Sequence, residues 1–406
     1  MTLDATRLSL QGKKAYRIAR NQGVAALGRR AARYAISNLP KPESAGLPLA
    51  SGDIADSWTI KPWELPESVP SGHPLSVGWV CAPPGPASGG HTTMFRYVRA
   101  LEEAGHRPVV LLYDPLFGGI EPSRRIIRQW WPDVRAEVRD VRDGMRGLDA
   151  VVATSWQSAH VVAMRPQVAG HRFYLVQDYE PLFYGRGPEH VLAEDSYRFG
   201  FHCLTVGGML SELLRSGHEA TCTPLEFGCD RAVYSLSNTS RRSGVAFYTR
   251  PETERRGHSL GVMALELFHE GHPDIPIHTY GTRVTLPFPA QHHAQLSPAA
   301  LAALYNTCAA GLALSFTNVS LVPFELLSCG AVPVVNDDPY SRPVLTHPGV
   351  RWARPTPAAL AEALSAVAAG DSPDPSSLAR DLGDLSWKES TQALVHLVEE
   401  TCWSRP

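Results

Sequence analysis

From Leu75 onward the sequence alternates short, almost wholly apolar runs with amphipathic stretches, and this alternation constrains the fold most. Continuous apolar runs are typical of parallel strands buried on both faces, and the amphipathic stretches are typical of helices that cover such a sheet. The predicted class is α/β, with two Rossmann-like doubly wound domains facing a cleft. Strands are predicted at 75–81, 108–113, 150–154, 173–177, 204–206 and 222–226, and then at 245–248, 277–280, 311–315, 331–335 and 351–353.

The two sets of strands are separated by residues 235–243, which are rich in Ser, Asn and Arg and have no apolar period. Residues 38–74 are rich in Pro, Ser and Gly and are predicted to form a linker. A last amphipathic helix at 388–402 can pack back across the junction. We therefore predict four segments, with the boundaries 1–74, 75–238, 239–375 and 376–406.

The overall charge is nearly balanced, with 38 basic and 40 acidic side chains, so a general nucleic-acid surface is not expected. The seven cysteines form no C-x-x-C pair, which favours reduced, buried thiols in a cytosolic protein. No apolar run is long enough to span a bilayer, and no secretory signal is evident. A soluble, cytoplasmic protein is expected.

The N-terminal segment departs from this balance, because residues 1–40 hold eight basic residues and one acid, a net charge of +7. Val24, Leu27, Ala31 and Tyr34 follow helical spacing. A basic amphipathic helix of this kind can lie on an anionic membrane, which would place the protein at the inner face of the cell membrane through residues 1–37. The alternatives are a helix docked on the protein itself and a disordered tail.

Residues 315–337 say most about function. They are predicted to form a strand end, a polar turn at 317–320, a short apolar helix with one acid, Glu325, and a second apolar strand after Gly330. A helix N-terminus at the carboxyl end of a parallel strand presents free N–H groups and a positive dipole end, which suit a phosphate. Glu325 can then receive hydroxyl groups, as from a ribose. The alternative is an ordinary crossover with a solvated glutamate.

The turn after the first predicted strand, residues 82–91, contains Gly89, Gly90 and His91. Paired glycines permit a ligand to approach the backbone at the N-terminus of the next helix. The turn lacks the G-x-G-x-x-G pattern, so NAD binding is not favoured. A sugar or acceptor contact is predicted here, and the alternative is simply a tight turn.

Residues 177–184 directly follow another apolar strand and contain two acids and two tyrosines. The carboxylates of Asp178 and Glu180 can bind sugar hydroxyl groups, while tyrosine rings can cover apolar faces. The alternative is a solvated loop in which Asp178 caps a turn.

Arg250, Arg255 and Arg256 follow the first strand of the second set. A basic pair in a strand-end loop can neutralise a diphosphate leaving group through charge-assisted hydrogen bonds. The arginines can instead pair with Glu252 and Glu254 in an exposed loop of little consequence.

Metal and hydrolase chemistry are not favoured by the sequence. The sixteen histidines show no metal-ligand spacing, and neither a G-x-S-x-G elbow nor a Walker loop is present.

Three motifs, in order, resemble those of the two-domain GT-B glycosyltransferases. Residues 228–234 resemble the G-v-D-x-x-x-F turn that closes the first domain. Residues 250–257 resemble the "R…K-G" loop of glycosyltransferase family 4, with Arg256 in the lysine position, and residues 320–335 resemble that family's nucleotide-sugar helix. Two positions depart from the family: Thr317 stands where its E-x7-E pattern has the first acid, and Gln177 where a histidine is common.

Residues 177–181 and the Ser-Gly-Gly-His turn at 88–91 are most similar to the bacterial surface-glycan rhamnosyltransferases of the WsaF type, which use dTDP-L-rhamnose. The resemblance implies transfer of a sugar, best guessed as L-rhamnose from dTDP-L-rhamnose, to a growing cell-surface glycan with retention of configuration. It implies an acceptor domain at 75–238, a nucleotide-sugar domain at 239–375, and a glycan or lipid-linked glycan as acceptor. No metal or other cofactor is implied, because arginines and a helix dipole would replace the metal.

The resemblance also implies roles for individual residues, with Arg256 facing the diphosphate. The side chain of Arg255 is expected to point away from that of its neighbour Arg256. The implied catalytic residues are Arg250, Arg256 and Asp178. The implied donor-binding residues are Gly281, Asn318, Ser320, Leu321 and Glu325. The implied acceptor- or sugar-binding residues are Gly89, Gly90, His91, Gln177, Glu180 and Tyr184.

Two other functions stay open. A non-hydrolysing nucleotide-sugar 2-epimerase has the same two-domain shape, but it would need acids and histidines around the sugar, and the sequence offers no such set. A glycan- or nucleotide-binding module without catalytic activity would account for Thr317 and Gln177.

Overall fold

A computed structural model describes residues 47–65, 68–86, 88–114, 119–168, 170–240, 242–380, 382 and 385–403. Contacts divide the chain into two units, Met1–Pro48 and Leu49–Pro406, and nearly all described residues belong to the second. The predicted basic helix within residues 1–37 lies outside the described residues. Among the residues that are described, no helix has both the length and the apolar character needed to cross a membrane.

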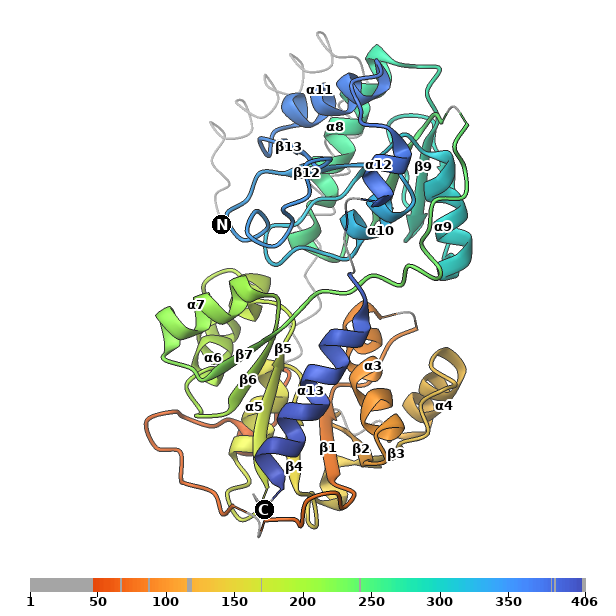
Figure 1. The fold of residues 1–406 in the computed structure, drawn as a ribbon. Helices are drawn as coiled ribbons and strands as arrows, with labels where there is room; N and C mark the ends of the chain where they lie inside the picture. Colours follow the sequence, from red (N-terminus) through yellow and green to blue (C-terminus); the bar gives the residue numbers. More distant parts are fainter. Residues whose placement is uncertain are drawn as a thin grey trace, which may run out of the picture. The chain divides into compact units, whose positions relative to one another are not determined.

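The first sheet contains seven parallel strands in the order β3-β2-β1-β4-β5-β6-β7 within the described residues (Figure 1). Its strands are β1 (Ser76–Cys81), β2 (Arg107–Leu112), β3 (Glu137–Asp140), β4 (Ala150–Ala153), β5 (His171–Val176), β6 (His202–Val206) and β7 (Cys222–Leu225). The helices of this part are η1 (Ser51–Asp53), α3 (Gly89–Glu103), α4 (Glu121–Trp130), η2 (Val141–Asp143), α5 (Trp156–Ala163), η3 (Glu180–Phe183), α6 (Pro188–Ser196) and α7 (Gly208–His218).

Both faces of this sheet are buried, as the continuous apolar runs predict. In β5, Phe173 and Leu175 join one hydrophobic cluster, while Tyr174 and Val176 point to the opposite face and join another. The alternation follows from the two-residue period of a strand. Strand β3 was not predicted, because it lies at the sheet edge and its residues are mostly exposed or half-buried and polar.

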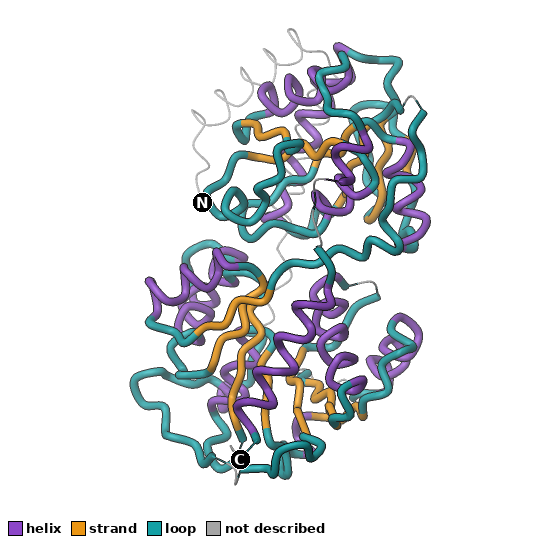
Figure 2. Tube along the Cα trace, viewed as in Figure 1, coloured by secondary structure: helices purple, strands orange, loops and turns teal. Residues whose placement is uncertain are grey.

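The second sheet contains six parallel strands in the order β10-β9-β8-β11-β12-β13 within the described residues. Its strands are β8 (Val245–Thr249), β9 (Ile277–Gly281), β10 (Gln291–His292), β11 (Ala310–Leu312), β12 (Val332–Asn336) and β13 (Arg351–Ala353). The helices of this part are η4 (Glu254–Arg256), α8 (His258–Gly271), α9 (Pro298–Thr307), α10 (Val322–Ser328), α11 (Pro357–Ala368) and α12 (Pro375–Arg380). Figure 2 shows strands flanked by helices in each sheet, which confirms the predicted α/β class with two doubly wound sheets.

The last helix, α13 (Trp387–Cys402), follows the second sheet in sequence but packs on α3 of the first (Figure 1). The hydroxyl groups of Tyr97 and Ser390 are 2.7 Å apart, and His106 Nε2 is 3.1 Å from Glu399 Oε1. Leu394 and Val398 of α13 are fully buried. The final helix thus completes the cover of the first sheet.

Candidate functional site

Four of the predicted functional segments follow strands at their carboxyl ends. Residues 82–91 follow β1, 177–184 follow β5, 250–256 follow β8, and 313–320 follow β11. In open α/β sheets, ligands bind outside the carboxyl ends of the strands, where the strand order reverses. In the second sheet the order reverses between β8 and β11, which pair directly.

Asp178 is the residue at which loops of the two sheets meet. Its Oδ1 accepts hydrogen bonds from the backbone N–H groups of Asn318 and Tyr179, both at 2.9 Å. Its Oδ2 accepts the hydroxyl hydrogen bond of Thr317 at 2.8 Å. Asp178 is only 8% exposed, so its carboxylate is held by the protein on several sides.

The side chain of Asn318 adds to this connection. Its Nδ2 donates to the carbonyl groups of Gln177 at 3.0 Å and Val206 at 3.2 Å, at the ends of β5 and β6. Asn318 is 2% exposed, so both amide hydrogens need partners inside the protein. The predicted donor-binding residue Asn318 therefore links the loop after β11 to the first sheet.

Arg256 is held against the same loop. Its NH1 donates to Ser315 Oγ at 2.6 Å and to the Asn318 carbonyl at 3.3 Å. Ser315 in turn donates its hydroxyl to that carbonyl at 2.7 Å. Burial lowers the pKa of Arg256 to about 10, against the opposing attraction of Asp178, so the guanidinium stays charged at neutral pH. The position of Arg256 at the predicted site is thus set by hydrogen bonds.

Arg255 also lies at this site, and the expectation that it points away is wrong. Its Nε is 3.7 Å from Asp178 Oδ2, and its Cζ lies 3.8 Å from the centre of the Phe183 ring. Arg255 and Arg256 are the last two residues of the short η4 helix, and Asp178 attracts both of their guanidinium groups. Nε of Arg255 is buried and has no hydrogen-bond partner among the described residues.

The third arginine of the loop behaves differently. Arg250 is 42% exposed at its side chain and pairs with Glu252 at 3.2 Å. This is the arrangement that the alternative interpretation of the loop anticipated, and it holds for Arg250 alone. The catalytic role of Arg250 stays a prediction.

The electrostatics of Asp178 follow from its surroundings. Burial raises the pKa of Asp178, while Arg256, the Asn318 N–H, the Thr317 hydroxyl and Arg255 oppose that rise in this order. Two cations facing one carboxylate leave a local excess of positive charge. This loop region therefore suits an anionic ligand group.

Glu180 is engaged elsewhere. Its Oε2 accepts the backbone N–H of Trp156, the first residue of α5, at 2.7 Å, and its own N–H donates to the Tyr197 hydroxyl at 3.1 Å. Tyr184 accepts the indole N–H of Trp156 at 3.0 Å. Glu180 is 7% exposed, and burial raises its pKa to about 8. In this structure Glu180 and Tyr184, which were both predicted to contact a sugar, instead form hydrogen bonds with Trp156 at the start of α5.

Glu180→Gln should stabilise the protein increasingly as the pH rises from about 5 to 8. In the folded protein burial raises the pKa of Glu180 from its ordinary value of 4.5 to about 8. The stability that the bound proton contributes is therefore complete below pH 4.5 and is lost as the pH rises through about 8. Glutamine keeps the acceptor for Trp156 without this loss, and the gain is at most ~1.4 kcal/mol per pH unit. Denaturant unfolding between pH 5 and 9 measures it.

The matched control is Glu252→Gln, which makes the same change at a side chain that is 55% exposed. A Glu180→Gln variant whose relative stability is the same at pH 5 and pH 8 would contradict the assigned environment of Glu180.

The glycine turn lies at the start of α3. Gln177 Nε2 donates to the Gly90 carbonyl at 3.1 Å, so two predicted sugar-binding positions are in contact. His91 Nδ1 lies 2.9 Å from Ser88 Oγ and its Nε2 lies 3.1 Å from the Ala82 carbonyl, which fits a neutral ring that donates from Nε2. Burial lowers the pKa of His91. A Cβ at Gly89 would meet no atom of the described residues within 4 Å, so these residues leave room beside the start of the helix.

Glu325 lies in a second cluster rather than beside Arg256. Burial raises the pKa of its carboxyl group to about 7, against the attraction of Arg96, and Tyr234 lies close to the same carboxyl group. Arg96 of α3 forms an ion pair with Asp230, and its Cζ lies 4.6 Å from the centre of the Trp387 ring. The predicted donor-binding residues are therefore distributed over two clusters.

The remaining predicted donor positions have distinct surroundings. Ser320 and Leu321 are half-buried and immediately precede α10. Gly281 has φ of +98°, and a Cβ there would lie 2.6 Å from the Tyr248 ring and 2.7 Å from the Thr249 carbonyl. The glycine at 281 is thus required by packing between β8 and β9, and its role toward a donor stays a prediction.

Sequence reasoning missed several members of these clusters. Thr317 was noted only as a departure from the family pattern, whereas its hydroxyl binds Asp178. Ser315 and Arg96 were assigned no role and carry no local signal, because their partners are far away in sequence. Asp230 was noted only as part of the turn at 228–234 and not as the partner of Arg96. Within the described part of the chain, no group of three or more His, Cys, Asp or Glu side chains is arranged to hold a metal ion.

Sequence comparison relates the chain to one protein family and to one further protein. Residues 243–365 match the family model for the WsaF C-terminal domain. A stretch of 237 residues, 55% of this chain, is 35% identical to the O-antigen biosynthesis protein RfbC of Myxococcus xanthus. The match covers 18% of that much longer protein.

Solved structures with this arrangement include HepE of Anabaena in complex with UDP-glucose, with a TM-score of 0.61 and 13% identity over 80% of this chain and 99% of that chain. A Listeria monocytogenes protein with a provisional assignment as a UDP-N-acetylglucosamine 2-epimerase has a TM-score of 0.56 and 10% identity over 82% of this chain and 98% of that one. At these identities the likeness shows a common fold and no more.

Proposed function

We propose, from the premise that this chain is a WsaF-like protein with the GT-B fold, that it transfers a sugar from a nucleoside diphosphate to a growing surface glycan. The observation that supports this most is the pair Arg255 and Arg256 beside Asp178, at the carboxyl ends of β8 and β5. The similarity to an O-antigen biosynthesis protein supports a glycan as the product.

In the proposed reaction, the two arginines bind the diphosphate and stabilise the negative charge that develops as the sugar–phosphate bond breaks. Preorganised donors aimed at developing charge are usually the largest contribution to such catalysis. Ser315 and the Asn318 carbonyl hold Arg256 before the donor arrives, so little reorganisation is needed. With retention of configuration, the departing phosphate oxygen takes the proton of the acceptor hydroxyl.

The donor proposed is dTDP-L-rhamnose, on the strength of the sequence resemblance at 88–91 and 177–181. Glu325 would receive the ribose hydroxyl groups, since it is a half-buried acid on α10. The glycine turn at the start of α3 would take the acceptor or the sugar. Residues 1–37 would hold the protein at the inner face of the membrane.

A donor screen tests the proposal. dTDP and dTDP-L-rhamnose should raise the melting temperature of the protein, because a ligand at about 100 times its Kd adds about 2.7 kcal/mol of stability. UDP-glucose belongs in the same screen because HepE was solved with it. NAD is the negative control, and an equal shift with NAD would reject the nucleotide-sugar assignment.

The epimerase alternative stays open because the chain shares its fold with the Listeria protein, and the shared fold alone does not separate the two activities. Product analysis separates the two functions, because a glycosyltransferase releases the nucleoside diphosphate when an acceptor is supplied. Conversion of a UDP-sugar to its 2-epimer without an acceptor would favour the epimerase. Binding without any turnover would favour the module that lacks activity.

A further inference from the structure

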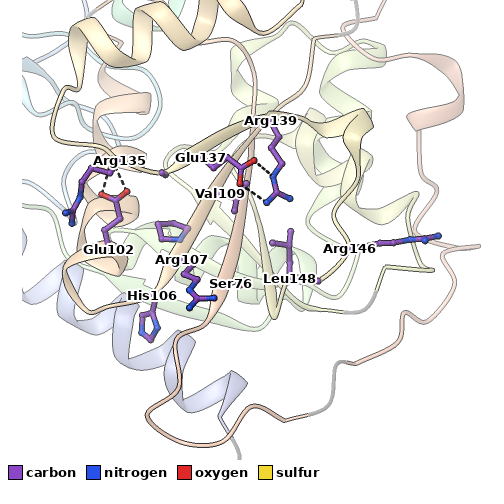
Figure 3. Close-up of a pocket in the computed structure, with 13 residues that line it drawn as sticks. Ser76, Glu102, His106, Arg107, Val109, Arg135, Glu137, Arg139, Arg146 and Leu148 are labelled. Atoms are coloured by element: carbon purple, nitrogen blue, oxygen red, sulfur yellow. Dashed lines mark hydrogen bonds and ion pairs between the residues drawn. The ribbon is translucent and has the colours of Figure 1, made fainter.

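A broad hollow lies at the edge of the first sheet where β1, β2 and β3 begin (Figure 3). These strands are parallel, so their carboxyl ends and the proposed acceptor loops lie at the opposite edge of the sheet from this hollow. Its volume is about 510 Å³, which falls in the range of small-molecule sites, roughly 300 to 1,000 Å³. Its charged lining residues are Arg107, Arg135, Arg139, Arg146, Glu102 and Glu137.

The hollow is positively charged in a part of the chain that is otherwise acidic. Four arginines less two glutamates leave a charge of +2 on the lining. The whole chain carries −2 and residues 1–40 carry +7, which leaves −9 for residues 41–406. An adjacent hollow of about 350 Å³ is lined by two arginines and three acids, which leave −1. Of the two hollows, only the larger one therefore has a lining with a net positive charge.

Most of this positive charge is not neutralised by neighbouring acids. Arg139 forms a double hydrogen bond with Glu137, at 2.8 Å on each side, and Arg99 of the adjacent hollow pairs with Glu103 at 2.7 Å. The other three lining arginines are Arg107, Arg135 and Arg146. Their guanidinium groups form no hydrogen bond or ion pair with any described residue.

Figure 3 shows how these groups are spread. Arg107 lies in the middle of the hollow near Ser76, while Arg135 and Arg146 lie on opposite sides of it. Glu102 accepts a hydrogen bond from the backbone N–H of Arg135 at 2.9 Å, so this contact does not involve the guanidinium group of Arg135. Three separated cations suit a ligand that carries its negative charge on more than one group.

We propose that this hollow is a second anion site, which binds a phosphate-bearing ligand of about the size of a sugar phosphate or a diphosphate. Arginine guanidinium groups form paired, charge-assisted hydrogen bonds with phosphate oxygens. Ser76 adds a hydroxyl group to the lining. The phosphate belongs either to a soluble phosphate ester or to an anionic lipid headgroup, and the inference does not depend on the proposed transferase activity.

Calorimetric titration with inorganic pyrophosphate at low salt tests the proposal. The titration uses the full chain with Arg256→Ala as background, because the proposed donor site also binds diphosphates. Adding Arg107→Gln and Arg146→Gln should weaken the remaining binding by at least about 10-fold, the scale of one charge-assisted hydrogen bond. Both arginines are exposed, so the melting temperature should not change.

Arg99→Gln is the matched control, because it removes an exposed arginine from the adjacent hollow, and it should leave pyrophosphate binding unchanged. Vesicles of phosphatidylglycerol and of phosphatidylcholine distinguish the sources of phosphate. Residues 1–37 are also proposed to bind the membrane, so vesicle affinity is compared with that of Arg99→Gln, which keeps those residues. A lipid headgroup is indicated if the double variant binds phosphatidylglycerol vesicles more weakly than Arg99→Gln does, and a soluble ester if only pyrophosphate binding falls. Unchanged binding of both probes in the double variant would overturn the proposal.

Discussion

Arg256→Ala should lower kcat/KM for sugar transfer by at least about 100-fold, the scale on which removal of one preorganised donor to a developing charge acts. The lost group is held by Ser315 Oγ at 2.6 Å and the Asn318 carbonyl at 3.3 Å, so its position is defined before any substrate binds. Most of the loss is expected in kcat, because the leaving group carries more negative charge in the transition state than in the bound donor. Steady-state kinetics with a released-nucleotide readout measures both constants.

Two further variants sharpen this test. Arg256→Lys keeps the positive charge but loses the planar guanidinium group, which can donate two parallel hydrogen bonds to a phosphate. Its activity should therefore lie between those of the wild type and of Arg256→Ala. Arg351→Ala is the control, because Arg351 is a half-buried residue that begins the edge strand β13 and pairs with Asp371, away from the carboxyl end of β8. Wild-type turnover by Arg256→Ala would remove this arginine from the mechanism.

Arg255 cannot serve as a silent control, since its Nε lies 3.7 Å from Asp178. Arg255→Ala is expected to reduce turnover as well, although its guanidinium lies over Phe183 and is less firmly held by hydrogen bonds. The two single variants and the double variant together show whether the arginines act as one unit, in which case their effects are not additive.

Asp178→Ala should destabilise the protein by roughly 3 to 5 kcal/mol, the cost of removing one partner from a buried charged pair. The change leaves the Thr317 hydroxyl and the Asn318 N–H without their acceptor, and it leaves Arg255 and Arg256 facing each other's charge. Denaturant unfolding followed by fluorescence measures the loss.

Asp178→Asn distinguishes charge from hydrogen bonding at this position. Asparagine keeps an acceptor for Asn318 and a group that can pair with Thr317, so its loss of stability should be clearly smaller than that of alanine. Glu252→Ala is the exposed control and should cost at most about 1 kcal/mol. Equal stability of Asp178→Ala and the wild type would mean that the bonds at Asp178 do not hold the two loops together.

The sequence by itself determined the architecture, because strand and helix periodicity are local properties that reading along the chain detects. The apolar runs at 173–177 and 331–335 become β5 and β12, and the parallel sheets follow from runs that must be buried on both faces. The same reasoning placed residues 177–184, 250–256 and 317–320 at strand ends. It missed β3 and β10, since short edge strands bury little apolar surface.

Only the tertiary structure decided which of these strand-end residues meet. Asp178 binds Thr317 and Asn318 across 139 and 140 residues of sequence, and Glu325 lies near Arg96, more than two hundred positions earlier. Arg250 and Arg255 lie in the same loop and look alike in sequence. Arg250 nevertheless pairs with the exposed Glu252, whereas Arg255 lies against Asp178. The physical reason is that burial and long-range charge, unlike periodicity, depend on how the sheets and their loops pack together.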